Sequence, residues 1–107
     1  MYATIRRYTV KDLTNAKETF KALKQRLEQK FVPMLQDVTG FHCYYVLTPD
    51  NRELVTVSIF EDRTGAQEST RRAAEFVRTD PVKDQLSAPQ ISEGDLLVSK
   101  EALIGAH

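Results

Sequence analysis

The densest run of chemically capable side chains in this 107-residue sequence is His42, Cys43, Tyr44 and Tyr45. A histidine titrates near neutral pH and can take a proton from a substrate, and a tyrosine hydroxyl can donate a hydrogen bond to an anionic oxygen. Alternate residues of a strand point to opposite faces, so His42 and Tyr44 share one face while Cys43 and Tyr45 share the other. At most half of the run can therefore line one pocket. The alternative is that His42 begins a strand near solvent and the tyrosines pack with their hydroxyls at the edge.

Two consecutive arginines, Arg6 and Arg7, lie in a predicted strand and must also point to opposite faces. Arg7 continues the face of Ile5, and Arg6 continues the face of the tyrosines. A buried guanidinium needs an anionic or carbonyl partner. The functional hypothesis places Arg7 in a cleft between sheet and helices, where it binds an acidic or phenolic ligand. The alternative is an ion pair between Arg7 and a carboxylate such as Glu61 or Asp95.

Composition narrows the classes of function. Fifteen basic residues balance fifteen acidic ones, so no net field favours nucleic acid or an anionic membrane, and no apolar run approaches the roughly 20 residues that span a bilayer. Cys43 is the only cysteine, which excludes an internal disulfide and favours a reducing, cytoplasmic location. We expect it to be a small buried hydrophobe rather than a nucleophile. The two histidines, His42 and His107, are too few and too distant to predict a metal site.

Hydrophobic periodicity and turn signals predict the elements that must position these residues. Asn15 with Glu18 resembles a capping box at the start of the first helix, Pro33 interrupts that helix, and Gly40 ends it. The expected elements are a strand (2–8), a helix (15–38), a hairpin (41–48 and 53–60), a second helix (64–77), a short helical turn (80–86) and a last strand (91–100).

This order predicts an α+β, ferredoxin-like βαββαβ fold, with a four-stranded antiparallel sheet in the order 4-1-3-2 and both helices on one face. Residues 1–107 form a single domain in this interpretation, with 101–107 as a tail of uncertain order. Apolar residues occupy both parities of the second and fourth strands, so the uncovered face cannot be purely polar. We therefore expect a homodimer in which two sheets pack face to face. The alternative is a monomer with a sufficiently polar face.

The whole chain resembles the antibiotic-biosynthesis-monooxygenase-like family of dimeric α/β-barrel proteins. The resemblance rests on MYATIRRYTVK before the first helix, TGFHCYYVL after it, and VSIFEDRTGAQEST from the third strand into the second helix. The family includes cofactor-free oxygenases of phenolic substrates, heme-degrading enzymes and isomerases. The heme-degrading branch has asparagine, tryptophan and histidine where this chain has Ile5, Ser69 and Leu86, and this chain has no tryptophan. The resemblance thus disfavours heme, and Phe60 stands where many relatives carry a stacking tryptophan.

Together these observations predict a cofactor-independent monooxygenase of a small phenolic or quinol-like compound, with no cofactor and no metal. His42 would be the base, and Arg7 or Tyr44 would stabilise the substrate anion. Tyr45 and Phe60 would contact the ligand. Two alternatives stay open. One is an isomerase or lyase that shifts a proton on a small acid, and the other is a dimeric binding protein without catalysis.

Overall fold

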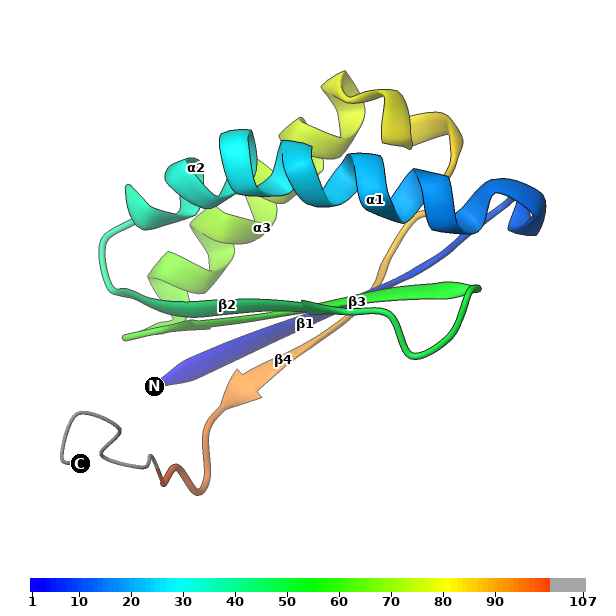
Figure 1. Cartoon of the computed structure of the whole chain (residues 1–107). Helices are drawn as coiled ribbons and strands as arrows, with labels where there is room; N and C mark the ends of the chain where they lie inside the picture. The colour runs from blue at the N-terminus through cyan, green and yellow to red at the C-terminus, as the bar shows by residue number, and fades with distance from the viewer. Residues whose placement is uncertain (101–107) are drawn as a thin grey trace, which may run out of the picture.

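The structure, a computed structural model, describes residues 1–100 and confirms the predicted topology. Four antiparallel strands form one sheet in the order β2-β3-β1-β4, and the helices cover only one of its faces (Figure 1). No helix in this part of the chain is long and apolar enough to cross a bilayer. The strands are β1 (Tyr2–Thr9), β2 (Phe41–Leu47), β3 (Glu53–Phe60) and β4 (Gln90–Asp95), and the helices are α1 (Ala16–Arg26), α2 (Val32–Gln36) and α3 (Arg63–Thr79).

The first helical segment is interrupted as Pro33 predicts. Between α1 and α2 the chain makes a π-helical turn, Leu27–Phe31, and the N–H of Val32 bonds to the carbonyl of Leu27, five residues back. Proline has no N–H to donate, and its ring crowds the preceding turn of a helix. A widened turn avoids this steric clash where Pro33 interrupts the helical hydrogen bonds. The predicted capping box at Asn15 is wrong: Asp12 caps a preceding 3-10 turn by accepting from the N–H of Thr14 at 3.0 Å.

Aspartates cap the second half of the fold. Asp62 caps the start of α3 by accepting from the N–H of Gly65 at 3.2 Å, and the helix begins at Arg63, one residue earlier than predicted. Asp80 accepts from the N–H of Val82 and also binds the guanidinium Nε of Arg26 at 2.9 Å. The Arg26–Asp80 ion pair thus fastens the end of α1 to the end of α3.

The last strand is shorter than predicted. β4 ends at Asp95, and Leu97 and Val98, which the sequence placed in a strand, are 96% and 82% exposed. Neither has a strand partner, because β1, to which β4 pairs, begins at Tyr2 opposite Asp95. The predicted tail, 101–107, lies outside the described residues.

The set of strand residues that faces the helices is the opposite of the one that the Arg7 hypothesis requires. Tyr2, Thr4, Arg6 and Tyr8 are buried beneath the helices, whereas Ile5 and Arg7 point to the uncovered face. On β3, Thr56 and Ser58 face the helices in the same way, and the residues that alternate with them, Val55, Val57 and Ile59, face outward. We call the uncovered side the open face; its apolar members are Ala3, Ile5, Cys43, Tyr45, Leu47, Val55, Val57 and Ile59.

Candidate functional site

A cation is buried between the sheet and α3. The Arg6 side chain is 2% exposed, the largest of the fully buried side chains in residues 1–100. Its Nη2 donates to Ser69 Oγ at 3.0 Å and to Thr70 Oγ1 at 2.9 Å, and its Nη1 lies 3.5 Å from Ser58 Oγ. Arg6 therefore meets hydroxyls from β3 and α3.

These hydroxyls are neutral, and the one carboxylate that acts on the Arg6 charge, Glu93 on β4, does so electrostatically without forming an ion pair within residues 1–100. Within residues 1–100 no carboxylate forms an ion pair with Arg6, and its Nε has no hydrogen-bond partner. Burial lowers the pKa of Arg6, because desolvation disfavours the charged form, but an arginine starts so high that it stays protonated near neutral pH. A buried, incompletely bonded cation is costly, and such groups concentrate at ligand-binding sites.

Arg6 lines a small cavity, the central cavity, with a volume of about 20 Å³. Two tyrosines, Tyr8 and Tyr44, line it as well. Burial raises the pKa of Tyr44 above its usual value and raises that of Tyr8, because both phenols would be ionised away from water. Both hydroxyls therefore stay neutral and can donate hydrogen bonds. The other lining residues are Leu23, Leu27, Phe31, Leu54, Thr56, Ala73, Phe76, Val77, Val82 and Leu86.

Two larger hollows flank the central cavity. The α1 cleft, about 560 Å³, shares Leu23, Leu27, Tyr44 and Leu54 with it; the remaining lining residues are Phe20, Lys21, Lys24, Glu28, Val32, Val46 and Thr48. A volume of this size is typical of small-molecule sites.

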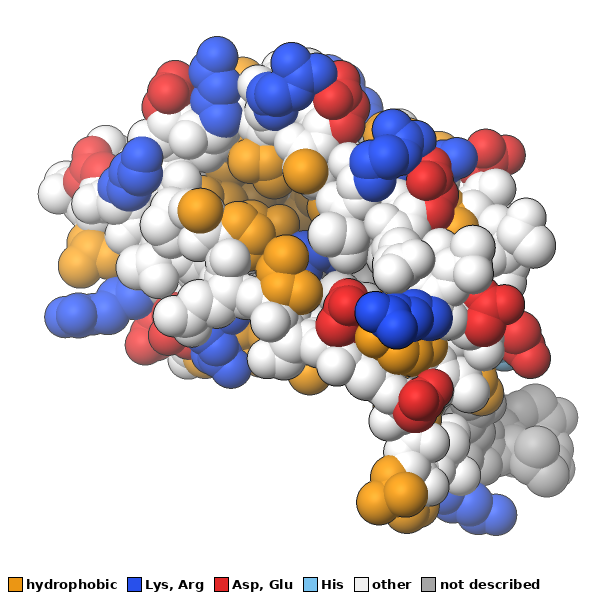
Figure 2. All heavy atoms as spheres, turned by 180° about the vertical axis from the view of Figure 1, so that it is seen from behind, with side chains coloured by type: hydrophobic (Ala, Val, Ile, Leu, Met, Phe, Trp, Pro, Cys, Tyr) orange, Lys and Arg blue, Asp and Glu red, His pale blue; other side chains and the backbone are white. Residues whose placement is uncertain are grey.

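The β4 groove, about 270 Å³, lies on the other side and shares Arg6, Tyr8, Ala73 and Val77 with the central cavity. Its remaining lining residues are Thr70, Ala74, Arg78, Ala88, Pro89 and Ile91. Figure 2 shows a hollow lined by hydrophobic side chains, with a basic side chain visible inside it.

The structure does not bring the predicted catalytic residues together. The prediction that Arg7 reaches the cleft is wrong, because Arg7 lies on the open face and forms an ion pair with Glu53 at 2.7 Å. The alternative of an ion pair is thus realised with a different carboxylate from the two expected. His42 lies at a β-bulge, where its Nε2 is 2.7 Å from Glu61 Oε2, and it lines none of the three hollows described above.

The predicted aromatic residues fall in three different environments. Tyr44 faces the helices and lines both the central cavity and the α1 cleft. Tyr45 points to the open face and is 61% exposed. Phe60 is fully buried against Phe41, with ring centroids 5.7 Å apart, so no ligand stacks on it in this arrangement. Of the five predicted site residues, only Tyr44 lines a cavity beneath the helices.

Sequence reasoning missed Arg6, Tyr8 and Thr56, although a signal for them was present. The tyrosines of β1 share the parity of Arg6, and α3 presents Ser69 and Thr70 at positions where an inner helix stripe is normally apolar. Buried hydroxyls on a helix and an arginine on the facing strand indicate one polar site in an otherwise apolar layer. No group of three metal-binding side chains gathers anywhere in residues 1–100.

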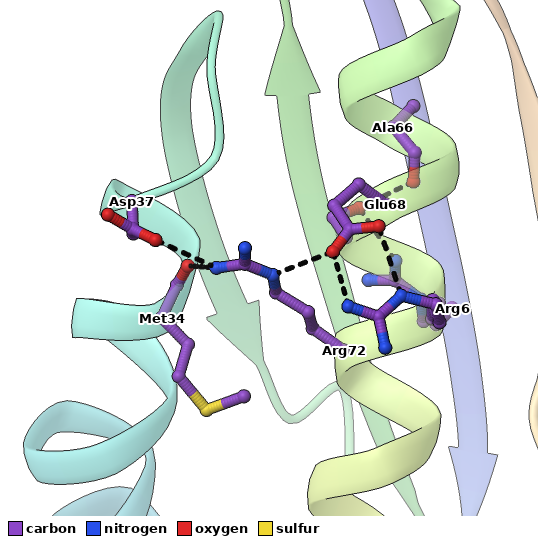
Figure 3. Close-up of polar contacts among 8 residues, drawn as sticks. Arg6, Met34, Asp37, Ala66, Glu68 and Arg72 are labelled. Atoms are coloured by element: carbon purple, nitrogen blue, oxygen red, sulfur yellow. Dashed lines mark hydrogen bonds and ion pairs between the residues drawn. The ribbon is translucent and has the colours of Figure 1, made fainter.

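An arginine on α3 connects this helix to α2. Arg72 donates to the carbonyl of Met34 at 2.6 Å and to Glu68 at 3.0 Å, and lies 3.5 Å from Asp37 (Figure 3). It thereby links the end of α2 to the outer side of α3. Arg6 approaches α3 from the sheet side, so the helix is tied to both of its neighbours by guanidinium groups.

Comparison with known proteins identifies solved structures that share this fold. No protein-family model and no curated protein matches the sequence. Among solved structures, a provisionally named antibiotic biosynthesis monooxygenase from Nitrosomonas europaea is similar with a TM-score of 0.66 at 18% identity, over 92% of this chain and 100% of that one. The chain has the fold of the antibiotic-biosynthesis-monooxygenase-like proteins.

Two further solved structures are similar to this chain. A dimeric ferredoxin-like protein from an uncultured marine organism has a TM-score of 0.74 at 8% identity, over 94% of this chain and 98% of that one. SnoaB, a cofactor-independent oxygenase from Streptomyces nogalater, has a TM-score of 0.58 at 9% identity, over 96% of each chain. At these identities the similarity establishes the shared fold.

Proposed function

We propose that this protein binds a small, largely apolar anion beneath its helices and oxygenates it without a cofactor. The substrate is a phenolic or quinol-like compound, bound with its ring in the α1 cleft and its anionic oxygen at Arg6. The observation that carries the proposal is the buried Arg6 cation, which has hydroxyl partners and no paired carboxylate among the described residues. A ligand anion would supply the missing charge.

The geometry supports ionisation of a bound phenol. An opposite charge within about 4–6 Å lowers the pKa of an acid by about 1–3 units, and the effect grows where water is excluded. Arg6 can thus populate a phenolate at neutral pH without a dedicated base. The neutral hydroxyls of Tyr8 and Tyr44 add hydrogen-bond donors at the same cavity.

An electron-rich anion of this kind can transfer an electron to dioxygen. For an anthrone-like substrate, whose keto tautomer has a ring CH2, the balanced reaction consumes one O2, converts this CH2 to C=O, and releases the second oxygen atom as water. The protein contributes by excluding water and stabilising the anion. The apolar lining of the α1 cleft, with Phe20, Val32 and Val46, suits the first task, and Arg6 suits the second.

Oxygen uptake tests the proposal. The purified protein is incubated with a panel of hydroquinones and anthrone-like compounds, and uptake is followed with an oxygen electrode. We expect uptake above the uncatalysed rate, and we expect Arg6→Met to reduce it by at least tenfold while Arg7→Met leaves it within about twofold. Uptake that is the same in the wild type and Arg6→Met would contradict the assignment of the site.

A second candidate is binding without catalysis. It is favoured by the lining of the central cavity, which contains no histidine and no carboxylate among the described residues. Tight binding of these compounds, with no oxygen uptake and no product formed under argon, would support this candidate. Conversion of a small acid under argon would instead support the isomerase alternative, for which the described cavity offers no carboxylate or imidazole base.

The proposal includes a homodimer in a reducing, cytoplasmic setting. The open face carries apolar side chains from β1, β2 and β3, among them Ile5, Tyr45 and Leu47, each more than a third exposed. A contiguous apolar face of this kind favours association with a second copy. The single cysteine is the basis for the compartment.

A further inference from the structure

We propose that Arg6 and Thr56 form a seat for one anionic oxygen atom, and that Ser69 and Thr70 position Arg6 without cancelling its charge. The inference rests on the proposed function, since it specifies how the site beneath the helices would select its ligand. It predicts a preference for a phenolate or enolate oxygen over a carboxylate.

The hydroxyls on α3 can only accept from Arg6. Ser69 Oγ donates to the carbonyl of Ala66 at 2.7 Å, and Thr70 Oγ1 donates to the same carbonyl at 3.2 Å. Each hydroxyl has one proton, so this bond leaves only lone pairs for the guanidinium. Neutral acceptors hold the Arg6 side chain in place, whereas a carboxylate at either position would also neutralise it. The positive charge remains for a ligand.

Two residues that line the central cavity each have an unpartnered buried polar atom. Arg6 and Thr56 are directly opposite each other on β1 and β3, and both line the central cavity. The Nε of Arg6 and the Oγ1 of Thr56 are buried, and neither has a hydrogen-bond partner within residues 1–100. An N–H and an O–H can donate together to one anionic oxygen, which would satisfy both.

The size of the central cavity limits the group that can occupy it. A volume of about 20 Å³ accommodates about one water-sized group. A carboxylate has a second charged oxygen, and a cavity of this volume leaves no room for it beside the first. A phenolate or enolate has one such oxygen, and its carbon frame can extend into the apolar α1 cleft.

A matched pair of probes tests the seat. 4-Nitrophenol and 4-nitrobenzoate share a ring and a nitro group and differ in the anionic group, and their binding to the full-length protein is measured by absorbance and calorimetry at a pH where both are ionised. We expect nitrophenolate to bind at least tenfold more tightly. Thr56→Val keeps the shape and removes the hydroxyl, so it should weaken nitrophenolate by at least tenfold and leave nitrobenzoate unchanged, because the hydrogen bond that is lost is one to a charged oxygen.

The positioning role of α3 has its own variant. Thr70→Asp places a carboxylate beside Arg6 and should weaken nitrophenolate by at least tenfold. Thr64→Asp adds the same charge at the exposed start of α3 and should change affinity by less than twofold. The absorbance of bound nitrophenol against pH provides an independent reading, since the apparent pKa of the bound probe should rise in Thr70→Asp and stay unchanged in Thr64→Asp.

The outcomes separate the seat from the proposed function. Equal affinity for the two probes, or tighter binding of nitrobenzoate, would overturn the one-oxygen seat while leaving anion binding at Arg6 intact. An unchanged nitrophenolate affinity in Thr56→Val would remove Thr56 from the seat, and an unchanged affinity in Thr70→Asp would remove the positioning role. Failure of the wild type to bind either probe would count against the proposed function itself.

Discussion

Two arginines in the described part of the chain illustrate how the partner determines the role of a cation. Arg26 is 23% exposed and is paired with Asp80, whose side chain is 4% exposed, and the pair connects α1 to the end of α3. Arg6 is buried more deeply, at 2% exposed, and is held by hydroxyls. Removing one partner of a buried ion pair leaves the other charge buried and uncompensated, which destabilises the fold. Removing a buried charge that has no ion-pair partner eliminates an unfavourable desolvation cost. The same substitution should therefore have opposite effects at the two positions.

We expect Arg6→Met to leave the free energy of unfolding unchanged or to raise it by up to about 4 kcal/mol, because a buried charge is replaced by an apolar chain. Ser69 and Thr70 keep their bonds to the carbonyl of Ala66 in this variant. Arg26→Met should instead lower the free energy by about 3–5 kcal/mol. Urea unfolding of both variants measures the contrast, and a loss of more than about 2 kcal/mol in Arg6→Met would show that the arginine serves the fold rather than a ligand.

The carboxylate of Glu68 makes stability depend on acid pH. Hydrogen bonds from Arg71, and then from Arg72, hold the pKa of Glu68 at about 2, well below its ordinary value of 4.5. The folded protein then binds fewer protons at this group than the unfolded chain, so its stabilisation is complete above about pH 4.5 and is lost as the pH falls toward 2.

Chemical unfolding at a series of pH values measures this dependence. Glu68→Gln should flatten the decrease in the free energy of unfolding between pH 4.5 and 2 relative to the wild type. Glu18→Gln, at an exposed position of α1, is the control and should keep the wild-type slope. Identical slopes in the wild type and Glu68→Gln would contradict the role of these hydrogen bonds.

At the scale of elements, close packing of α3 against β3 sets the height of the helical layer above the sheet. Gly65 is buried in the first turn of α3, and a Cβ at this position would lie 3.0 Å from the Phe60 ring and 3.0 Å from the carbonyl oxygen of Thr39. Phe60 is fully buried, and the second neighbour is backbone, so neither can move freely. The helix can approach the sheet at this end only with glycine.

We expect Gly65→Ala to destabilise the protein. Alanine is favoured over glycine in a helix by about 1 kcal/mol, but forcing a methyl group into a packed contact costs about 1–3 kcal/mol, so the steric effect should prevail. Gln67→Ala, two residues along and exposed, is the control for helix propensity and should be neutral or slightly stabilising. Thermal and urea unfolding of the two variants provide the comparison. A Gly65→Ala protein more stable than the wild type would mean that α3 can lift away at little cost.

At the scale of the whole molecule, the helices cover one side of the sheet and a second copy is proposed to cover the other (Figure 1). Burial of apolar area is the main favourable term in such an association. Arg7 and Glu53 pair at one end of the open face, where they form a polar margin. An apolar centre with a polar margin is typical of a protein interface.

Sedimentation at micromolar concentration should therefore give twice the 12.2 kDa mass of the chain. Ile5→Glu introduces a charge at the centre of the open face and should shift the equilibrium toward monomer by at least tenfold. Gln25→Glu adds the same charge on the exposed side of α1 and should leave the dimer intact. A compact 12.2 kDa particle in the wild type would contradict the proposed assembly.

The amino-acid sequence by itself determined the order of the elements, the strand order of the sheet and the break at Pro33. These follow from periodicity, turn residues and chain connectivity, which are local properties or have few solutions. It also showed that apolar and small polar residues alternate within 53–60, as in Val55, Thr56 and Val57.

Only the tertiary structure decided which parity faces the helices. The apolar parity, with Ile5 and Val57, lies on the open face, and the mixed parity, with Arg6 and Thr56, lies beneath α3. Alternation along a strand distinguishes two faces but does not say which surface covers each one. Here the helical layer supplies hydroxyls from residues more than 60 positions away from Arg6, and such long-range pairing has no counterpart in the local pattern of β1.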